Sequence, residues 1–227
     1  MSDVYYTTKF PGYVVQEFTI ENLKKYDVEY LEKYARFDKF KTETLNALRL
    51  DKILEHIYSD NIKLLEVGYG TGEFLKSAAN SEYINIDAYG YDVIPSELPK
   101  KVKRVERIDD TFICKEDRVK SFDVVCFFDS LEHIEVSDIR DYLKLFDTKY
   151  IFVSVPWYHY HESTEWFRDW YHRRPNEHLH HFDSFGLMTL LSSIGYDIIH
   201  ISNFEDEIRK SKSHLPNILS VIAKKRD

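Results

Sequence analysis

The sequence predicts an α/β fold in which helices cover both faces of a mostly parallel sheet, and three observations support this fold class. Short apolar runs typical of strands alternate with helical patterns, as expected for parallel strands joined by crossover helices. A cluster of glycines directly follows the first of these runs. The last two strand candidates are joined by a polar segment without a clear helical pattern, so the last strand is expected to enter the sheet antiparallel.

The predicted elements follow one another in a regular order. Strands are expected at residues 63–67, 84–91, 102–108, 122–128, 150–155, 196–202 and 218–224, which makes a seven-stranded sheet. Helices are expected at residues 73–79, 130–146 and 184–194. Apolar residues at three- and four-residue spacing between residues 20 and 58 predict two or three amphipathic helices. We therefore expect one compact unit with an N-terminal helical cap (1–58), a main domain (59–227) and an insert (156–182).

Charge and composition narrow the function classes. With 31 Lys and Arg against 39 Asp and Glu, the formal net charge is −8, which opposes binding to nucleic acid phosphates. No run approaches the roughly 18 consecutive apolar residues of a membrane-spanning helix. The N-terminus lacks a secretory signal pattern, so a cytoplasmic location is expected. The two cysteines, Cys114 and Cys126, fit a reducing compartment and are too few for a disulfide framework.

A glycine cluster marks the first candidate site. The chain has only seven glycines, and three of them, Gly68, Gly70 and Gly72, follow a predicted strand and precede a predicted helix. Open α/β sheets bind ligands at this position, and glycine lets the backbone approach a ligand closely. A dinucleotide fingerprint would need glycine where Glu73 stands, and the Gly-Lys-Ser/Thr of a phosphate loop is missing. The carboxylate of Glu66 would repel a pyrophosphate and attract an ammonium group, so we expect a ligand that carries a cation.

Residues 66–72 (Glu-Val-Gly-Tyr-Gly-Thr-Gly) match the first motif of the class I S-adenosylmethionine-dependent methyltransferases at every fixed position, and the chain resembles this family. The resemblance continues, in the family's order, through Gly90-Tyr91-Asp92, Phe122-Asp123-Val124-Val125, Leu131-Glu132-His133, residues 153–156, residues 177–182 and Gly195-Tyr196. The Leu-Glu-His and His-Phe signatures look most like the branch of ubiquinone-biosynthesis, sugar and natural-product O-methyltransferases. The resemblance implies a Rossmann-like fold, S-adenosyl-L-methionine as cofactor and a small-molecule methyl acceptor.

The resemblance also implies which residues bind the cofactor. They are Glu66, Gly68, Tyr69, Gly70, Gly72, Asp92, Asp110, Thr111, Asp129 and Ser130. The glycines would let the backbone approach the methionine and ribose parts, and Asp92 would accept hydrogen bonds from both ribose hydroxyls. Asp110 and Thr111 would contact the adenine edge. Asp129 and Ser130 would line the other side of the pocket.

The histidines gather in one segment. Six of the ten lie between residues 156 and 182, together with all three tryptophans. This segment follows a predicted strand and is expected to form a wall or lid of the active site. Methyl transfer needs a dry site and a nucleophile that loses its proton, and histidine is suited to remove it near neutral pH. From their positions in the resembled families, His133, His181 and His178 are the expected catalytic residues.

The spacing Asp129-x-x-Glu132-His133 has two further interpretations. It resembles the Glu-x-x-Glu-His of a small-RNA 2′-O-methyltransferase family, in which these residues and a downstream histidine, here His178 or His181, bind a divalent metal. Asp129 as a helix N-cap, with Glu132 three residues later, also has the pattern of a capping box. We favour the cap, expect no metal, and expect His133 to act as a base without one.

The expected function is S-adenosylmethionine-dependent methyl transfer to an oxygen of a small acceptor such as a sugar or a phenol. One alternative is a metal-assisted RNA 2′-O-methyltransferase, which the acidic charge opposes and which activity lost on chelation would support. Another is a non-catalytic S-adenosylmethionine-binding subunit, which the intact cofactor motif and the histidine-rich insert oppose. The N-terminal tyrosines and phenylalanines are expected to pack in the core or cap.

Overall fold

The computed structural model describes residues 4–27, 29, 39–94, 96–211 and 213–227. Its contacts divide the chain into two compact units. The glycine-loop unit consists of Tyr26–Phe128 and Leu143–Phe152, and the histidine unit consists of Met1–Lys25, Asp129–Tyr142 and Val153–Asp227. This grouping differs from the expected cap (1–58) and main domain (59–227), which stay a prediction.

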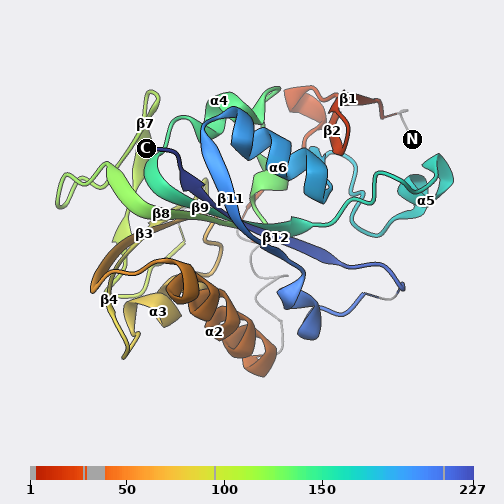
Figure 1. The fold of residues 1–227 in the computed structure, drawn as a ribbon. Coiled ribbons are helices and arrows are strands. Elements are labelled where there is room, and N and C mark those ends of the chain that lie inside the picture. The colour runs from red at the N-terminus through yellow and green to blue at the C-terminus, as the bar shows by residue number, and fades with distance from the viewer. Residues whose placement is uncertain (1–3, 28, 30–38, 95, 212) are drawn as a thin grey trace. The chain divides into compact units, whose positions relative to one another are not determined.

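The predicted seven-stranded sheet is confirmed, with the strand order β11-β12-β9-β8-β3-β4-β5 (Figure 1). Its strands are β3 (Asn61–Val67), β4 (Asn85–Tyr91), β5 (Lys103–Arg104), β8 (Ser121–Phe128), β9 (Asp147–Pro156), β11 (Tyr196–Ser202) and β12 (Ile218–Lys225). β3 pairs in parallel with both β4 and β8, and β4 pairs in parallel with β5. β12 pairs antiparallel with β11, as expected for the last strand.

The glycine-loop unit contains two helices in addition to β3 and β4. α2 (Lys39–His56) and α3 (Glu73–Ala79) lie side by side (Figure 1), and α3 has the predicted bounds. The side chains of Leu64 in β3, Leu75 in α3 and Val125 in β8 are completely buried. Burial of such a side chain contributes about 1.5 to 3 kcal/mol to stability. This core therefore fixes the ends of the strands from which the glycine loop begins.

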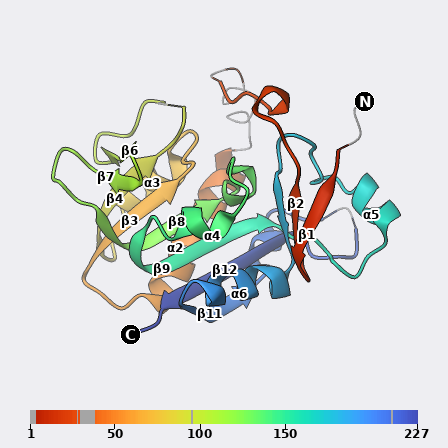
Figure 2. The ribbon, with the colours of Figure 1, turned by 90° about the horizontal axis from the view of Figure 1, so that it is seen from above.

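The strand predicted over residues 102–108 is interrupted. Only β5 joins the large sheet, whereas β6 (Glu106–Ile108) pairs antiparallel with β7 (Thr111–Ile113) in a separate hairpin (Figure 2). Between them, the N–H of Val105 still donates to the carbonyl of Gly90 over 2.8 Å. The chain then reverses after β6, where Asp109 has a φ of 52°. Apolar residues occur on both sides of the break in the strand predicted over residues 102–108, so the apolar pattern of the sequence does not reveal this break.

The histidine unit starts with a β-hairpin that the sequence did not predict. β1 (Tyr6–Phe10) and β2 (Tyr13–Gln16) pair antiparallel, and β2 also pairs antiparallel with β10 (His180–Phe182) (Figure 2). Gly12 makes the turn with a φ of 79°, and a Cβ there would lie 1.9 Å from the Oδ1 atom of Asp183. Of the helices predicted between residues 20 and 58, η1 (Ile20–Asn22) and α2 are present. The rest of that prediction includes residues 28 and 30–38, which lie outside the described residues.

The helix predicted over residues 130–146 is wrong. The structure has a short η2 (Leu131–His133) and a separate α4 (Ile139–Leu143) in its place. Ile134 is extended, and its carbonyl accepts a hydrogen bond from the Nε2 atom of His180 over 2.8 Å, which replaces a helical bond. The carboxylate of Asp138 then accepts the N–H of Arg140 over 3.0 Å at the start of α4. The unit also contains α5 (Thr164–Asp169), α6 (Ser184–Ser193) and η3 (Phe204–Glu207).

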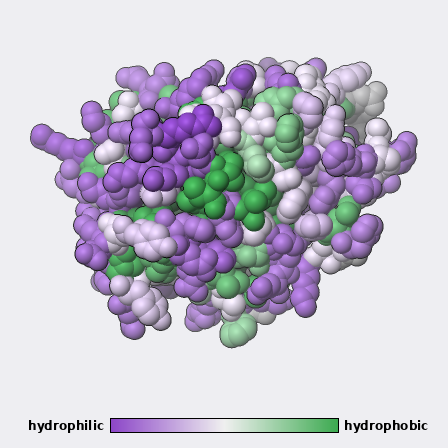
Figure 3. All heavy atoms as spheres, in the orientation of Figure 1, coloured by the Kyte–Doolittle hydropathy of each residue, from purple (hydrophilic) through white to green (hydrophobic). Residues whose placement is uncertain are grey.

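The surface contains an apolar patch over an edge strand. Figure 3 shows apolar side chains gathered over β11, where Ile199 and Ile201 are 38% and 40% exposed. β11 is the first strand in the sheet order, so the patch marks one edge of the sheet. Among the described helices, none has both the length and the apolar character needed to cross a membrane.

Candidate active site

The loop between β3 and α3 presents open backbone. Gly68, Gly70 and Gly72 have φ angles of 77°, 53° and 73°, a region that residues with a Cβ rarely adopt. A Cβ on Gly70 would meet no atom within 4 Å. The glycines therefore set the path of the loop, and the backbone at Gly70 is open to a ligand.

Asp92 lies beside this loop. It directly follows β4, whose residues pair in register with those of β3. Its Oδ2 atom accepts the N–H of Gly70 over 2.8 Å, and its Oδ1 atom accepts the N–H of Ile94 over 2.9 Å. Burial raises the pKa of Asp92, and these backbone donors oppose that rise. Each carboxylate oxygen can accept a further hydrogen bond, so Asp92 is suited to a ligand with two hydroxyls.

Glu66 places a buried carboxyl group at the start of the loop. The residue is 4% exposed, and its Oε2 atom has no hydrogen-bond partner among the described residues. Burial raises the pKa of Glu66 to about 8, while Arg49 lowers it and Asp92 raises it further. A buried carboxylate oxygen without a partner is costly unless a ligand satisfies it. The ammonium group of an amino acid fits this position.

We predict that cofactor affinity depends on pH through Glu66. An ammonium group binds the charged carboxylate, so binding below the pKa of about 8 must release the proton of Glu66. Affinity for S-adenosylhomocysteine should therefore rise by up to about tenfold per pH unit between about pH 6 and pH 8. Calorimetric titrations across this range measure it. Glu66→Gln should remove the contribution of this group, and an unchanged pH profile in that variant would contradict the assignment.

Tyr69 holds the glycine loop in place through hydrogen bonds to residues of another segment. Its ring is 4% exposed, its hydroxyl donates to the carbonyl of Ser96 over 3.2 Å, and that hydroxyl accepts from the Nη1 atom of Arg104 over 2.9 Å. The hydroxyl of Ser96 in turn donates to the carbonyl of Gly70 over 2.7 Å. Ser96 and Arg104 were not predicted from the sequence, because no local motif marks residues that reach the loop from another segment.

The structure does not place every predicted cofactor residue at the loop. Asp110 and Thr111 lie at the turn of the β6–β7 hairpin, outside the seven-stranded sheet. The side chain of Asp110 is 81% exposed and forms an ion pair with Arg107 at 3.1 Å. The glycines, Glu66, Tyr69 and Asp92 are brought together, whereas contacts of Asp110 and Thr111 with adenine stay a prediction.

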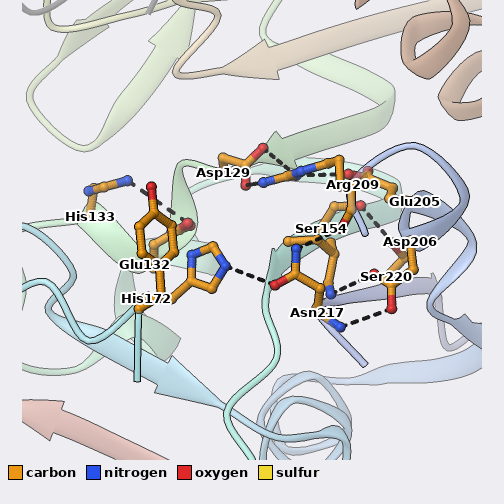
Figure 4. A network of polar contacts seen from close by, with 12 residues as sticks. Asp129, Glu132, His133, Ser154, His172, Glu205, Asp206, Arg209, Asn217 and Ser220 are labelled. Carbon is orange, nitrogen blue, oxygen red and sulfur yellow. Dashed lines mark hydrogen bonds and ion pairs between the residues drawn. The ribbon is translucent and has the colours of Figure 1, made fainter. Parts of the chain in front are cut away.

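In the histidine unit, Asp129 is held by an arginine from the C-terminal part of the chain (Figure 4). Its Oδ1 and Oδ2 atoms each accept a hydrogen bond of 2.8 Å from the guanidinium of Arg209. Arg209 also donates to the completely buried Glu205 over 2.9 Å. The N–H of Asp129 donates to the carbonyl of Ser154 over 2.9 Å, not to Glu132. The predicted capping box is therefore wrong, because the long-range ion pair replaces the local cap.

The same network continues to a histidine. Asn217 donates from Nδ2 to the carbonyl of Arg209 and accepts at Oδ1 from the Nε2 atom of His172 over 3.0 Å. The side chain of Asp206 accepts the N–H groups of Asn217 and Ile218, each over 2.9 Å (Figure 4). His172 is thereby fixed with its proton on Nε2. Ser130 is buried but makes no side-chain cap, and its contact with the cofactor stays a prediction.

Glu132, His133 and His178 form a compact cluster. Glu132 is 1% exposed, and neither carboxylate oxygen has a hydrogen-bond partner in the described part of the chain. The Nδ1 atom of His133 donates to the carbonyl of Glu177 over 2.8 Å, so its Nε2 atom has the lone pair, 3.9 Å from Oε1 of Glu132. Nδ1 of buried His178 also lacks a hydrogen-bond partner there. One donor atom of each residue lies within 4.8 Å of the others, so the cluster could hold a divalent metal ion.

The predicted catalytic histidines are uncharged near neutral pH, with His178 and His181 buried and His133 half-buried. Burial lowers the pKa of His133, lowers that of His178 well below its usual value, and lowers that of His181 to about 3. The rings of Tyr6, Phe167 and Trp170 surround His181 at centroid distances of 5.6, 5.2 and 5.8 Å. At neutral pH all three imidazoles are therefore neutral, the form that binds a metal.

Three other histidines of the insert either form structural hydrogen bonds or are exposed. His180 bridges two elements, because its Nε2 atom donates to Ile134 and its Nδ1 atom accepts from the hydroxyl of Tyr13 over 2.8 Å. His159 donates from Nε2 to the carbonyl of Pro216 over 2.8 Å. His161 is exposed. These three are therefore structural or surface residues.

A surface hollow in the glycine-loop unit lies away from this chemistry. It has a volume of about 770 Å³ and is lined by residues that include Ile57, Tyr58, Tyr83 and Lys101. Asn85, the first residue of β4, also lines it, so the hollow lies at the opposite end of the strand from Asp92. Ligands of open α/β sheets bind at the carboxyl ends of the strands, so the glycine loop stays the predicted cofactor site.

The seven-stranded sheet with an antiparallel strand and the open glycine loop between β3 and α3 agree with the resemblance seen in the sequence. Residues 34–201 match the model of a family described as a methyltransferase domain, and the chain belongs to this family. It is an S-adenosylmethionine-dependent methyltransferase, and S-adenosyl-L-methionine is its cofactor. No curated protein matches the chain.

Solved structures share the fold at low identity. An S-adenosylmethionine-dependent methyltransferase from Clostridium acetobutylicum has a TM-score of 0.53 and 11% identity, covering 86% of this chain and 94% of that one. The magnesium protoporphyrin IX methyltransferase of Synechocystis, with bound S-adenosylhomocysteine, has a TM-score of 0.53 and 10% identity, covering 91% and 92%. A small RNA methyltransferase has a TM-score of 0.54 and 17% identity, covering 90% of this chain but 27% of its own.

Proposed function

We propose that the protein transfers a methyl group from S-adenosyl-L-methionine to an oxygen of a small acceptor, such as a sugar or a phenol. The observation that carries this proposal is His133. Its Nδ1 proton is held by the carbonyl of Glu177, its Nε2 atom has the lone pair, and its lowered pKa keeps it neutral. A neutral imidazole fixed in this tautomer is prepared to accept a proton. We place the protein in the O-methyltransferase branch that its Leu-Glu-His segment resembles.

In this proposal each of the site residues has its own role in binding or proton transfer. Glu66 would hold the ammonium group of the cofactor, Asp92 would accept hydrogen bonds from the ribose hydroxyls, and the glycines would let the loop backbone approach the ligand. When bound, S-adenosyl-L-methionine would supply a methyl group on a positively charged sulfur. Nε2 of His133 would accept the proton that the acceptor oxygen loses. His178 and His181 shape a dry acceptor site, because both are buried and neutral.

The chemistry of the chain favours a small acceptor. A net charge of −8 opposes a polyanionic substrate. The aromatic rings around His181 provide flat apolar walls of the kind that pack against a phenol or the apolar face of a sugar. We also propose a cytoplasmic location, which the two free, buried cysteines support.

A second candidate function uses a metal ion. The buried carboxylate of Glu132, whose oxygens lack hydrogen-bond partners among the described residues, favours it, together with the closeness of His133 and His178. Two imidazoles and one carboxylate suit ions such as Fe²⁺, Mn²⁺ or Zn²⁺. An ion there would lower the pKa of an acceptor hydroxyl, and His133 would bind metal rather than remove a proton. Activity abolished by a chelator and restored by a divalent ion would establish this function and exclude His133 as a metal-free base.

Cofactor binding tests the shared part of both candidates, and Asp92 is the residue to change. Asp92→Ala removes the acceptor for two ribose hydroxyls, so affinity for S-adenosylhomocysteine should fall by about 2 to 3 kcal/mol in titration calorimetry. Asp87→Ala, in the same strand, is the matched control and should leave the affinity unchanged. Equal affinity in wild type and Asp92→Ala would mean that the ribose is bound elsewhere.

A further inference from the structure

Arg173, which follows α5 in the insert, has a charge that no carboxylate neutralises in the described part of the chain. Arg174 beside it, by contrast, pairs with Glu177 at 3.0 Å. The Nη1 atom of Arg173 donates to the carbonyl of Arg168 over 3.2 Å. Its Nε atom is buried and has no hydrogen-bond partner among the described residues. A buried donor of this kind is costly unless a ligand satisfies it.

The guanidinium of Arg173 lies over two aromatic rings. Its carbon is 5.2 Å from the centre of the Tyr6 ring, in β1, and 5.7 Å from that of the Phe167 ring, in α5. The two rings meet edge to face at 5.0 Å, which places β1 beside α5 (Figure 2). Ring faces attract a cation but accept no strong hydrogen bond from it, so the planar fork of Arg173 is suited to a carboxylate as well.

Two further polar atoms near Arg173 lack partners. The hydroxyl of Tyr6 and the Nε2 atom of His181 are buried and have no hydrogen-bond partner in the part of the chain that the structure describes. Burial raises the pKa of Tyr6 and lowers that of His181, and the charge of Arg173 lowers both, so Arg173 lies close to both groups. A hydroxyl and an imidazole N–H can each donate to an anion. Tyr6, Arg173 and His181, here called the Arg173 cluster, thus offer donors to one ligand group.

The Arg173 cluster extends from the surface inward. Arg173 is half-buried, whereas His181 is 2% exposed, with the rings of Phe167 and Trp170 at 5.2 and 5.8 Å from its own. These flat faces suit an aromatic ligand. After burial, the charges of His133 and His181 are the largest effects that lower the pKa of His178, and the rings of His133 and His178 meet at 4.5 Å. The cluster is therefore continuous with the proposed base.

We propose that the Arg173 cluster binds a carboxylate of the methyl acceptor, so that the acceptor is an aromatic acid with a hydroxyl group. This inference rests on the proposed methyl transfer to oxygen and names a substrate class for it. The acceptor ring packs among the aromatic side chains of the insert, and its hydroxyl is directed to His133. A single carboxylate is compatible with a chain of net charge −8, because the local cation attracts it.

Two probes that differ only in the anion provide the test, protocatechuate, which is a dihydroxybenzoate, and its neutral amide. With S-adenosylhomocysteine at saturation, calorimetry should show wild type binding protocatechuate about 10- to 100-fold more tightly than the amide. Arg173→Met keeps an apolar contact with the rings and removes the charge, so it should bind both probes alike. Arg168→Met is the matched control, because this arginine of the same insert is exposed and pairs with Asp169, and it should keep the wild-type ratio.

The outcomes separate this inference from the proposed function. Wild type binding both probes equally, or neither, would overturn the inference without any variant and leave methyl transfer to another acceptor intact. A preference that survives in Arg173→Met would overturn the role of Arg173. If that variant does not fold, Tyr6→Phe replaces it. Loss of one donor should then lower the preference severalfold, and an unchanged preference would overturn the cluster.

Turnover of the same probe tests the proposed function itself. With S-adenosylmethionine as cofactor, wild type should convert protocatechuate to a methoxybenzoate, which mass spectrometry detects. Carboxylate-dependent binding without this product would contradict the proposed methyl transfer to oxygen and leave the carboxylate site in place.

Discussion

Replacing His133 with alanine is expected to lower turnover by about 10²- to 10⁴-fold and to leave affinity for S-adenosylhomocysteine nearly unchanged. The imidazole accepts the acceptor's proton only as the methyl group is transferred, so its loss raises the barrier without removing a cofactor contact. Single-turnover kinetics measure the chemical step directly, and calorimetry measures cofactor affinity. Desolvation lowers the pKa of the half-buried ring, which favours its neutral form.

His161→Ala is the matched control, because this histidine belongs to the same insert but is exposed. It should behave as wild type. A His133→Ala variant that is folded and turns over at the wild-type rate would exclude His133 as the base. A chelator added to wild type separates the two candidate functions: activity that persists supports metal-free proton removal, and activity lost and then restored by a divalent ion supports the metal site.

Arg209→Met is expected to lower the free energy of unfolding by about 3 to 5 kcal/mol. The substitution leaves Glu205, which is completely buried, without the cation that neutralises it, and also frees Asp129. An unpaired charge in a protein interior costs far more than the pair itself contributes. Urea denaturation of wild type and variant measures the difference.

Arg226→Met is the control for this prediction. Arg226 also forms an arginine–carboxylate pair, with Asp197 at 2.7 Å, but their side chains are 50% and 64% exposed. Its loss should cost about 1 kcal/mol or less, because water screens exposed pairs. The double change Arg209→Met with Glu205→Leu should recover part of the stability. Equal small losses in both single variants would contradict the importance of burial at Arg209.

The sheet and the glycine loop could be predicted because their signals are local. Residues 66–72 determine the loop through three glycines, and the pattern around α3 determines its bounds. Asp92 follows from its position after β4. Each of these depends on neighbours within a few residues, so one stretch of sequence contains the needed information.

The rest depends on contacts between distant parts of the chain. Asp129 followed by Glu132 has the pattern of a cap, but Arg209, 80 residues away, takes the carboxylate. The N-terminal hairpin gains its third strand from β10, and no residue near the hairpin in the sequence indicates that pairing.

The most direct measurement is the thermal unfolding of the purified protein with and without S-adenosylhomocysteine. At a ligand concentration about 100 times the dissociation constant, binding should stabilise the fold by roughly 2.7 kcal/mol and raise the unfolding temperature. In Asp92→Ala the stabilisation at the same ligand concentration should shrink to about 0.3 to 0.9 kcal/mol, because that variant binds the ligand more weakly. A folded wild-type protein whose unfolding temperature does not change at any ligand concentration would contradict the cofactor site assigned to Glu66, the glycine loop and Asp92.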